Sequence, residues 1–288
     1  MNAALLGLVA AFGWGLHDFI GRFASRRVGT GGTTLSVMVS GFLLLTVWTL
    51  GSGIPPMPGG RELMLVGFTG VVYALALILL FAALSCGPLS LVSVVVAAYP
   101  ASIVAFHILG GERPGPVTWI AMAAVLAGTL LVVGAAGQAV RRADEAPYQI
   151  GRATLLSILS HLSFAASLSA GQTVAPLLGD VEATWLARAA GLGLVGVFCL
   201  RDRPSPAATM RWLPALAVMG ALDVIALGAI LTAGSYDHPQ LAPVVSSGYG
   251  AVAVVLALVF LKEPVAPFQW LGIALVVAGS AVLSAGLG

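Results

Sequence analysis

The sequence predicts an all-α membrane protein in which ten transmembrane helices form two inverted five-helix repeats. The first observation is composition: 59% of the 288 residues are hydrophobic and 8% are charged, whereas soluble domains carry about 25% charged residues. The second is a series of long apolar runs. The third is a repeated phrase, "ERPGPVTWIAMAAVLAG" at 112–128 and "EPVAPFQWLGIALVVAG" at 263–279, with the same spacing of Glu, Trp and Gly. These features indicate a lipid environment and an internal duplication.

Each apolar run is long enough to cross a bilayer, whose hydrocarbon core of about 30 Å needs about 20 helical residues. Backbone amides in lipid must bond to one another, which a helix achieves by itself. The first run holds His17 and Asp18 and lacks a basic start, so we expect a membrane helix there rather than a signal peptide. The ten expected helices are 2–20, 33–51, 62–84, 89–109, 116–136, 153–174, 183–200, 212–233, 241–261 and 265–286.

The helices divide evenly about the longest polar stretch, "QAVRRADEAPYQIGR". A shift of about 150 residues places Trp14 on Phe164 and Tyr99 on Tyr249. Because each repeat has an odd number of helices, the halves have opposite orientations, an arrangement typical of secondary transporters with a substrate site near the bilayer midplane. The expected bounds of the first repeat, the polar linker and the second repeat are 1–136, 137–152 and 153–288.

The sequence lacks the motifs of several other protein classes. It has no basic cluster with interleaved aromatic residues, so we expect no nucleic-acid partner. Cys86 and Cys199 have no metal-ligand spacing, and there is no Gly-rich phosphate loop, so no metal, cofactor or ATP-driven step is expected. Ser247 and His161 stand outside any protease motif. We therefore predict no catalytic residues and expect that the protein is not an enzyme.

The distribution of Lys and Arg predicts the orientation in the membrane, because cytoplasmic loops carry an excess of both. The stretches after even-numbered helices hold only Arg61 and Arg113. The bias predicts that the odd-numbered loops are cytoplasmic and that both termini lie outside. The stretches after odd-numbered helices hold ten basic residues, Arg22, Arg26, Arg27, Arg141, Arg142, Arg152, Arg201, Arg203, Arg211 and Lys262.

Three sets of motifs resemble the EamA-type branch of the drug/metabolite transporter superfamily. "AFGWG" at 11–15 is similar to its Trp-Gly signature, "GGERP" at 110–114 and "LKEP" at 261–264 to its paired Glu motifs, and the repeated phrase to the last helix of its repeats. The resemblance implies a ten-helix exporter of small organic solutes in a bacterial inner membrane. The overall plan resembles amino acid exporters, including those for aromatic amino acids. Arg188 matches the family's Arg in the second helix of a repeat, but Met38 stands there in the first half.

Arg188 and Asp223 are the charged residues expected inside the membrane. At about 1.5 Å per residue they lie at similar depth, and ionisable groups in lipid need a partner or a cavity. They form either a structural ion pair that locks two helices or a switchable charge that meets a substrate carboxylate or a proton. Glu112 and Glu263 precede prolines at helix starts, where the helix dipole favours an anion, and are interpreted as structural.

Aromatic residues near mid-span are candidates for substrate binding, because aromatic belts normally lie at the membrane interfaces. Trp14, Tyr73, Tyr99 and Tyr249 either pack between helices or stack on a flat substrate, with the hydroxyl or indole as a polar handle. Ser246 belongs to the small polar patch "VVSSGYG". That patch fits either close helix packing or a surface that faces the substrate.

His161 and Phe164 share a helix face at the depth of Trp14. His161 either satisfies a hydrogen bond between helices or lines the cavity, where titration near neutral pH would suit proton coupling. Asp18 stands four residues before Arg22, a spacing that places both charges on one face. We expect this pair as a contact at the end of the first helix or as a gate at the cytoplasmic mouth.

Together these residues predict a secondary active or facilitative transporter that exports amino acids, including aromatic or other amphipathic ones, or related small metabolites by alternating access. A cationic drug exporter is the alternative if Asp223 is free of Arg188. A nucleotide-sugar carrier is another, but it would need more basic groups in the cavity. The expected partners are the small-molecule substrate and the lipid bilayer, and a monomer suffices because one chain holds both repeats.

Overall fold

The structure is a computed structural model, which describes residues 2–53, 58–111, 113–142, 148–233, 236–238 and 241–285. It contains ten helical spans, each of which is long enough and apolar enough to cross a membrane. These ranges contain no strand, and the predicted all-α fold of ten spans is confirmed. The spans are α1 (Ala3–Arg27), α2 (Thr30–Ser52), α3 (Gly60–Cys86), α4 with α5 (Leu89–Ala97, Tyr99–Leu109), α6 (Pro116–Arg142), α7 (Ile150–Leu178), α8 (Asp180–Asp202), α9 (Pro206–Ala233), α10 with α11 and the π-helical η1 (Leu241–Ser246, Tyr249–Leu256, Ala257–Leu261), and α12 (Pro267–Ser284).

The fourth and ninth spans are interrupted at equivalent positions, so the duplication is visible in the backbone. α4 and α5 part at Ala98, with φ −75° and ψ 0°, and α11 follows Gly248, with φ −73° and ψ −1°. These two residues are separated by the same 150 positions that relate Tyr99 to Tyr249. In the first half the break coincides with Pro100, which has no amide proton to continue the helical ladder.

The turns before the second and seventh spans repeat in the same way. Gly29 precedes α2 at φ +90°, and Gly179 precedes α8 at φ +89°. Only glycine adopts such a conformation without strain, so the chain reverses at once. α1 runs on to Arg27 rather than ending near residue 20, and Arg22, which the orientation count treats as a loop residue, lies buried within the helix.

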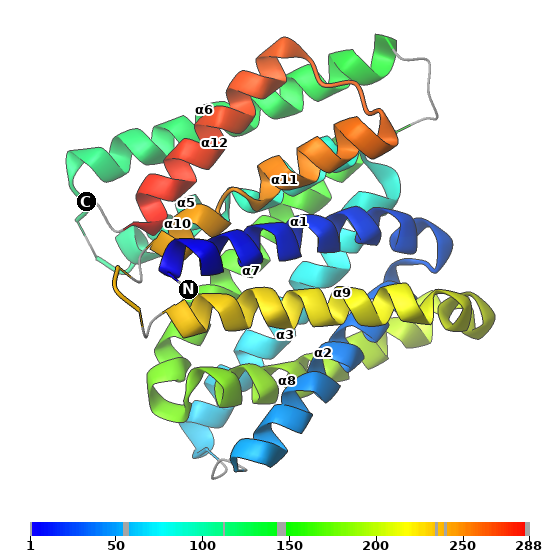
Figure 1. The fold of residues 1–288 in the computed structure, drawn as a ribbon, viewed down its shortest axis with the longest axis vertical. Helices are drawn as coiled ribbons and strands as arrows, with labels where there is room; N and C mark the ends of the chain where they lie inside the picture. The colour runs from blue at the N-terminus through cyan, green and yellow to red at the C-terminus, as the bar shows by residue number, and fades with distance from the viewer. Residues whose placement is uncertain are drawn as a thin grey trace.

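The repeated phrase of the sequence forms the contact between α6 and α12, which cross as the green and red helices of Figure 1. A methyl group on Gly128 would lie 2.6 Å from the carbonyl oxygen of Gly272. One on Gly279 would lie 2.8 Å from the carbonyl oxygen of Ala121. The two contacts are equivalent, because the repeat relates Gly128 to Gly279 and Ala121 to Gly272. Close approach through small residues is a principal way in which helices associate in lipid, and this explains why both phrases keep their glycine.

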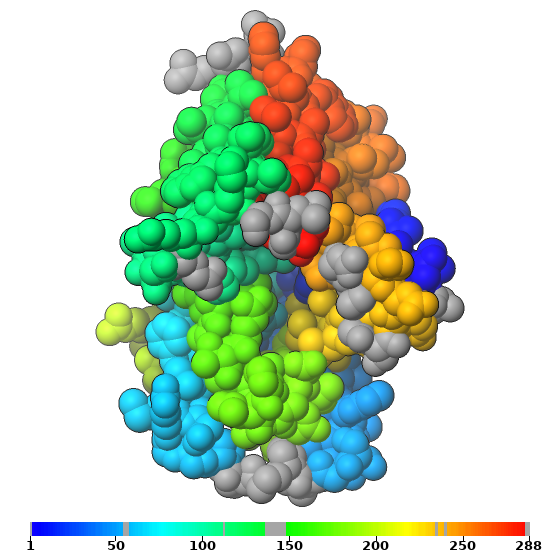
Figure 2. Space-filling model, turned by 90° about the vertical axis from the view of Figure 1, so that its left-hand side faces the viewer, coloured from blue at the N-terminus to red at the C-terminus, as the bar shows by residue number. Residues whose placement is uncertain are grey.

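The spans run side by side, with the described ends of the chain at the same end of the bundle in Figure 1. Large apolar side chains such as those of Val47, Leu130 and Leu200 are more than 70% exposed, as expected for surfaces that face lipid. Figure 2 looks at the end where α1 begins. This face is hollowed between the green of α7 and the yellow of α9, where blue atoms of the first helices are visible deeper inside.

The connection between the halves is partly helical. α6 continues to Arg142, which includes the first six residues of the linker expected over 137–152. Residues 143–147 lie outside the described ranges, and α7 begins at Ile150. The amide of Gln149 donates a hydrogen bond of 2.9 Å to the carbonyl oxygen of Cys86. The second half therefore starts in contact with the end of α3.

Candidate functional site

Asp223 of α9 is the centre of a buried polar cluster near mid-span. It forms an ion pair with Arg188 of α8, which bonds carboxylate oxygen Oδ2 through Nη2. The hydroxyl of Tyr73 donates to the same oxygen at 2.8 Å, and the indole of Trp14 donates to Oδ1 at 3.2 Å. Asp223 is 6% exposed and Arg188 is 2% exposed. The carboxylate is thus held by donors from both repeats, which compensates for the loss of water.

Arg188 is held by its surroundings as well as by its partner. Its guanidinium lies 5.3 Å from the ring centroid of Tyr73, a cation–π distance. It also packs against Gly41 of α2, where the missing side chain leaves room for it. Nitrogens Nε and Nη1 have no hydrogen-bond partner among the described residues. Arg188 therefore keeps donors that Asp223 and Tyr73 do not use.

Aromatic rings surround this ion pair. Trp14 and Tyr249 meet edge to face with centroids 6.0 Å apart, and Tyr73 and Phe164 do so at 5.7 Å. Tyr99 belongs to the same small apolar cluster as Trp14 and Tyr249. The structure therefore brings together the expected aromatic residues and the charged pair. Edge-to-face geometry is the preferred arrangement for such rings.

His161 and Ser246 are not hydrogen-bonded to the Asp223 cluster. His161 bonds Ser102 of α5 through Nε2 at 2.5 Å and the carbonyl of Val95 through Nδ1 at 3.0 Å. Val95 lies in the last turn of α4, so His161 joins α7 to the break in the fourth span. Ser246 is buried and donates to the carbonyl of Pro243 in its own helix at 3.0 Å. Neither Ser102 nor Val95 is marked by a signal in the sequence.

The expected ion pair between Asp18 and Arg22 is wrong. Asp18 Oδ1 lies 3.2 Å from Nδ1 of His17, and Oδ2 accepts a hydrogen bond of 2.7 Å from Ser93 of α4. Arg22 turns instead to Glu263, at 3.8 Å. The i,i+4 spacing does put Asp18 and Arg22 on one face of α1, but Asp18 bonds Ser93 on α4, and Arg22 faces Glu263 in the segment before α12.

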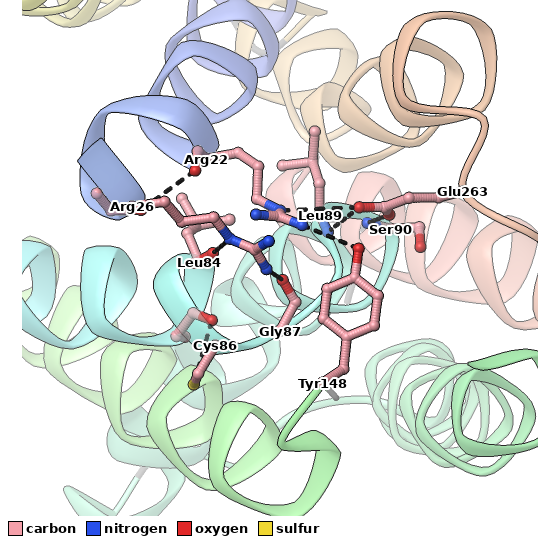
Figure 3. A network of polar contacts seen from close by, with 11 residues as sticks. Arg22, Arg26, Leu84, Cys86, Gly87, Leu89, Ser90, Tyr148 and Glu263 are labelled. Carbon is pink, nitrogen blue, oxygen red and sulfur yellow. Dashed lines mark hydrogen bonds and ion pairs between the residues drawn. The ribbon is translucent and has the colours of Figure 1, made fainter. Parts of the chain in front are cut away.

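Arg22 belongs to a second network, which Figure 3 shows at the far end of α1. Arg22 donates to the hydroxyl of Tyr148 at 2.9 Å, and the guanidinium groups of Arg22 and Arg26 lie 5.4 Å and 5.3 Å from the Tyr148 ring centroid. Arg26 also reaches the carbonyl oxygens of Leu84 and Gly87, each at 3.4 Å. The arginines thus join α1 to the end of α3 and to the segment before α7.

Glu263 caps a helix, but not the one that follows it. Its carboxylate accepts hydrogen bonds from the amides of Leu89 and Ser90, both at 3.0 Å. These are free amides of the first turn of α4, where the helix dipole favours an anion. The structural role expected for Glu263 at a helix start is therefore exerted across the repeats. Glu112, its counterpart in the first half, lies outside the described ranges.

A pocket of about 480 Å³ lies away from the Asp223 cluster. Arg27, in its wall, is 13 residues beyond Trp14 on α1, which is about 20 Å at 1.5 Å per residue. The pocket is therefore at the end of the bundle rather than at mid-span. Its lining residues are Arg27, Ala207, Ala208, Arg211 and Trp212.

The fold is that of a ten-span membrane protein built from two inverted repeats, and residues of both repeats form a buried polar cluster near mid-span. Secondary transporters have this organisation. A family model described as the EamA-like transporter family matches residues 1–134 and 151–285. The chain therefore belongs to the EamA-like transporter family, and its function is membrane transport of small metabolites. None of the curated proteins matches the sequence. A solved crystal structure of a protein matches with a TM-score of 0.63 and 20% identity, covering 97% of this chain and 95% of that one, which shows a shared fold.

Proposed function

We propose that this chain exports amino acids, including aromatic or other amphipathic ones, or related small metabolites by alternating access. The observation that carries the proposal is the buried pair of Arg188 and Asp223, with aromatic rings from both repeats around it. A zwitterion matches this pair: its carboxylate binds the arginine and its ammonium group binds the aspartate. The apolar part of the substrate stacks on Trp14 and Tyr249.

The unused donors of Arg188 favour a working charge over a purely structural lock. A lock would be most stable with every donor bonded, because a buried donor without a partner costs free energy. Nε and Nη1 of Arg188 are buried without one. A substrate carboxylate offers two oxygens to a guanidinium, a geometry that suits arginine better than lysine. The incoming carboxylate thus supplies what Asp223 leaves unsatisfied.

The charges of the cluster weigh against the two alternative cargoes. A cationic drug that bound Asp223 would take the counter-charge from Arg188 and bring no carboxylate to replace it, whereas a zwitterion brings one. A nucleotide sugar would need several cations for its phosphates. Among the described residues of the cluster, Arg188 is the one arginine. Arg22, further along α1, is engaged by Glu263.

We assign the network of Arg22, Glu263 and Tyr148 to the closed gate. It seals the end of the bundle opposite the hollowed face of Figure 2. Alternating access requires that one end be closed while the other is open. If the Lys and Arg count gives the orientation, this gate faces the cytoplasm of a bacterial inner membrane and the termini lie outside. One chain contains both repeats, so the working unit is a monomer.

Counterflow in liposomes tests the proposal. Vesicles that contain the purified protein are loaded with an unlabelled mixture of the twenty amino acids and diluted into a 14C-labelled mixture. We expect labelled amino acids to accumulate inside by exchange, and single amino acids added in excess to reveal the preferred substrate by competition. Vesicles without protein are the control. Exchange no greater than in those vesicles would overturn the assignment of amino acids as cargo.

A further inference from the structure

Three carboxylates are buried in the described part of the chain, and they differ in what neutralises them. Asp223 faces Arg188, and Glu263 faces Arg22. Arginine stays protonated at any physiological pH. Asp18 has a histidine, His17, as its basic partner. Histidine gains and loses its proton near neutral pH, so this pair alone among the three can change its net charge by one proton.

The geometry of the pair leaves one nitrogen free. His17 Nδ1 lies 3.2 Å from Asp18 Oδ1, and Ser93 donates to Oδ2 at 2.7 Å. His17 and Asp18 are each 3% exposed, and Nε2 of His17 is buried without a hydrogen-bond partner in the described structure. The imidazole ring packs on Phe81, with centroids 5.6 Å apart. A buried imidazole nitrogen without a partner is a position where a proton can enter or leave.

The pair lies between the proposed substrate site and the proposed gate. Trp14, Asp18 and Arg22 are spaced four residues apart on α1, so they share one face in layers about 6 Å apart. Trp14 bonds Asp223, and Arg22 bonds the network of Figure 3. Movement of α1 would therefore change the surroundings of all three layers together.

The other groups that face the pair come from four helices. Asp223 of α9 interacts electrostatically with His17, and Tyr249 of α11 does so with Asp18. α3 contributes the ring of Phe81, and α4 contributes Ser93, neither of which titrates near neutral pH. Two carboxylates, those of Asp18 and Asp223, are therefore the negative charges that His17 faces.

Other titratable groups near mid-span are already committed. Both ring nitrogens of His161 are hydrogen-bonded, to Ser102 and to Val95. Asp223 is bonded to arginine, tyrosine and tryptophan. By contrast, loss of the proton from His17 would leave the Asp18 charge buried without a cation. Such a charge is costly in a membrane, so the proton stays until the gate opens and water reaches the pair.

We propose that His17 and Asp18 form a proton-binding site that carries one proton in each transport cycle and thereby couples the proposed export to a proton gradient. The inference rests on the proposed function for its coupling, but the binding site stands on its own geometry. Water on one side of the membrane delivers the proton to the imidazole of His17, and water on the other side removes it.

The first test needs no substrate. Protein labelled with 13C-histidine is placed in lipid nanodiscs, and the His17 signal is identified by its absence from His17→Gln. We expect that signal to move reversibly when the pH is changed between about 5 and about 8, and to respond differently in Asp18→Asn, which removes the carboxylate beside the imidazole. A His17 signal that stays unchanged across this range in the native protein would overturn the proton site.

The second test separates coupling from transport. The 14C amino acid mixture is used in liposomes, once for exchange without a gradient and once for net flux driven by an imposed pH difference. We expect the native protein to show both activities, and Asp18→Asn and His17→Gln to keep exchange but lose the effect of the gradient. Asp237→Asn, on an exposed turn, is the matched control and should keep both.

The outcomes are distinguishable. Gradient-driven flux that persists at the native level in both Asp18→Asn and His17→Gln would overturn the coupling. Native protein that exchanges no amino acid would overturn the proposed function, while the His17 titration would still decide whether the proton site exists. The exchange activity of the variants also shows that they are folded.

Discussion

The central residue of the site illustrates how one position takes different roles in the two repeats. Asp223 and Tyr73 are equivalent by the 150-residue shift, and they hydrogen-bond to each other. Arg188 corresponds in the same way to Met38, and each packs near a glycine of the opposite repeat, Gly41 or Gly191. The two halves therefore have equivalent positions, which carry charges only in the second half.

Removal of the Asp223 charge separates the two interpretations of the ion pair. In Asp223→Asn the buried Arg188 loses its counter-charge, which costs about 3–5 kcal/mol, so we expect a lower unfolding temperature and no amino acid exchange. In the double variant Asp223→Asn with Arg188→Met we expect most of the stability to return without exchange. Native exchange in the folded double variant would show that the pair is only a lock.

The sequence could predict that Arg188 and Asp223 form a pair, because the number of residues from each helix end gives the depth of a side chain in the membrane. It also marked the aromatic residues, since tyrosine and tryptophan are unusual at mid-span. It could not predict that Asp18 would bond Ser93, 75 positions away, in place of Arg22. Such partners depend on which helices become neighbours, and spacing within one helix carries no information about that.

At the scale of helices, the ten spans could be predicted because lipid demands runs of a fixed length. The ends were harder. α1 passes its expected end because Arg22 finds buried partners, so a polar residue does not mark a loop there. The sequence contains only a partial indication of the helix breaks at Ala98 and Gly248, namely Pro100 in the first half and Gly248 itself in the second. Their common geometry comes from packing that both repeats share.

The contact between α6 and α12 should not tolerate a larger side chain in place of its glycines. A Val at Gly272 would collide with the backbone of α6 at Gly128, and overpacking of this kind costs about 1–3 kcal/mol. We expect Gly272→Val to lower the unfolding temperature in detergent. Gly134→Val, on α6 with no atom near the new side chain, is the matched control. Equal effects of the two changes would contradict the close contact.

For the whole molecule, an even number of spans puts both termini on one side, and the Lys and Arg bias predicts that this side is the outside. Most of the basic residues counted after odd-numbered helices lie at one end of the bundle, and the burial of Arg22 removes one without reversing the bias. We expect a reporter that is active only outside the cytoplasm to work at the C-terminus. The same reporter inserted after Arg203, in the turn between α8 and α9, should be inactive. The reverse pattern would refute the orientation.

Unlike residues at equivalent places have an energetic consequence. If the two repeats were identical, a two-fold rotation about an axis in the membrane plane would convert the state open on one side into the state open on the other, and their free energies would be equal. Here one repeat has methionine and tyrosine where the other has arginine and aspartate. The two states therefore differ in free energy, so the empty carrier rests mainly in one of them. The two conformational changes of the transport cycle then have different rates.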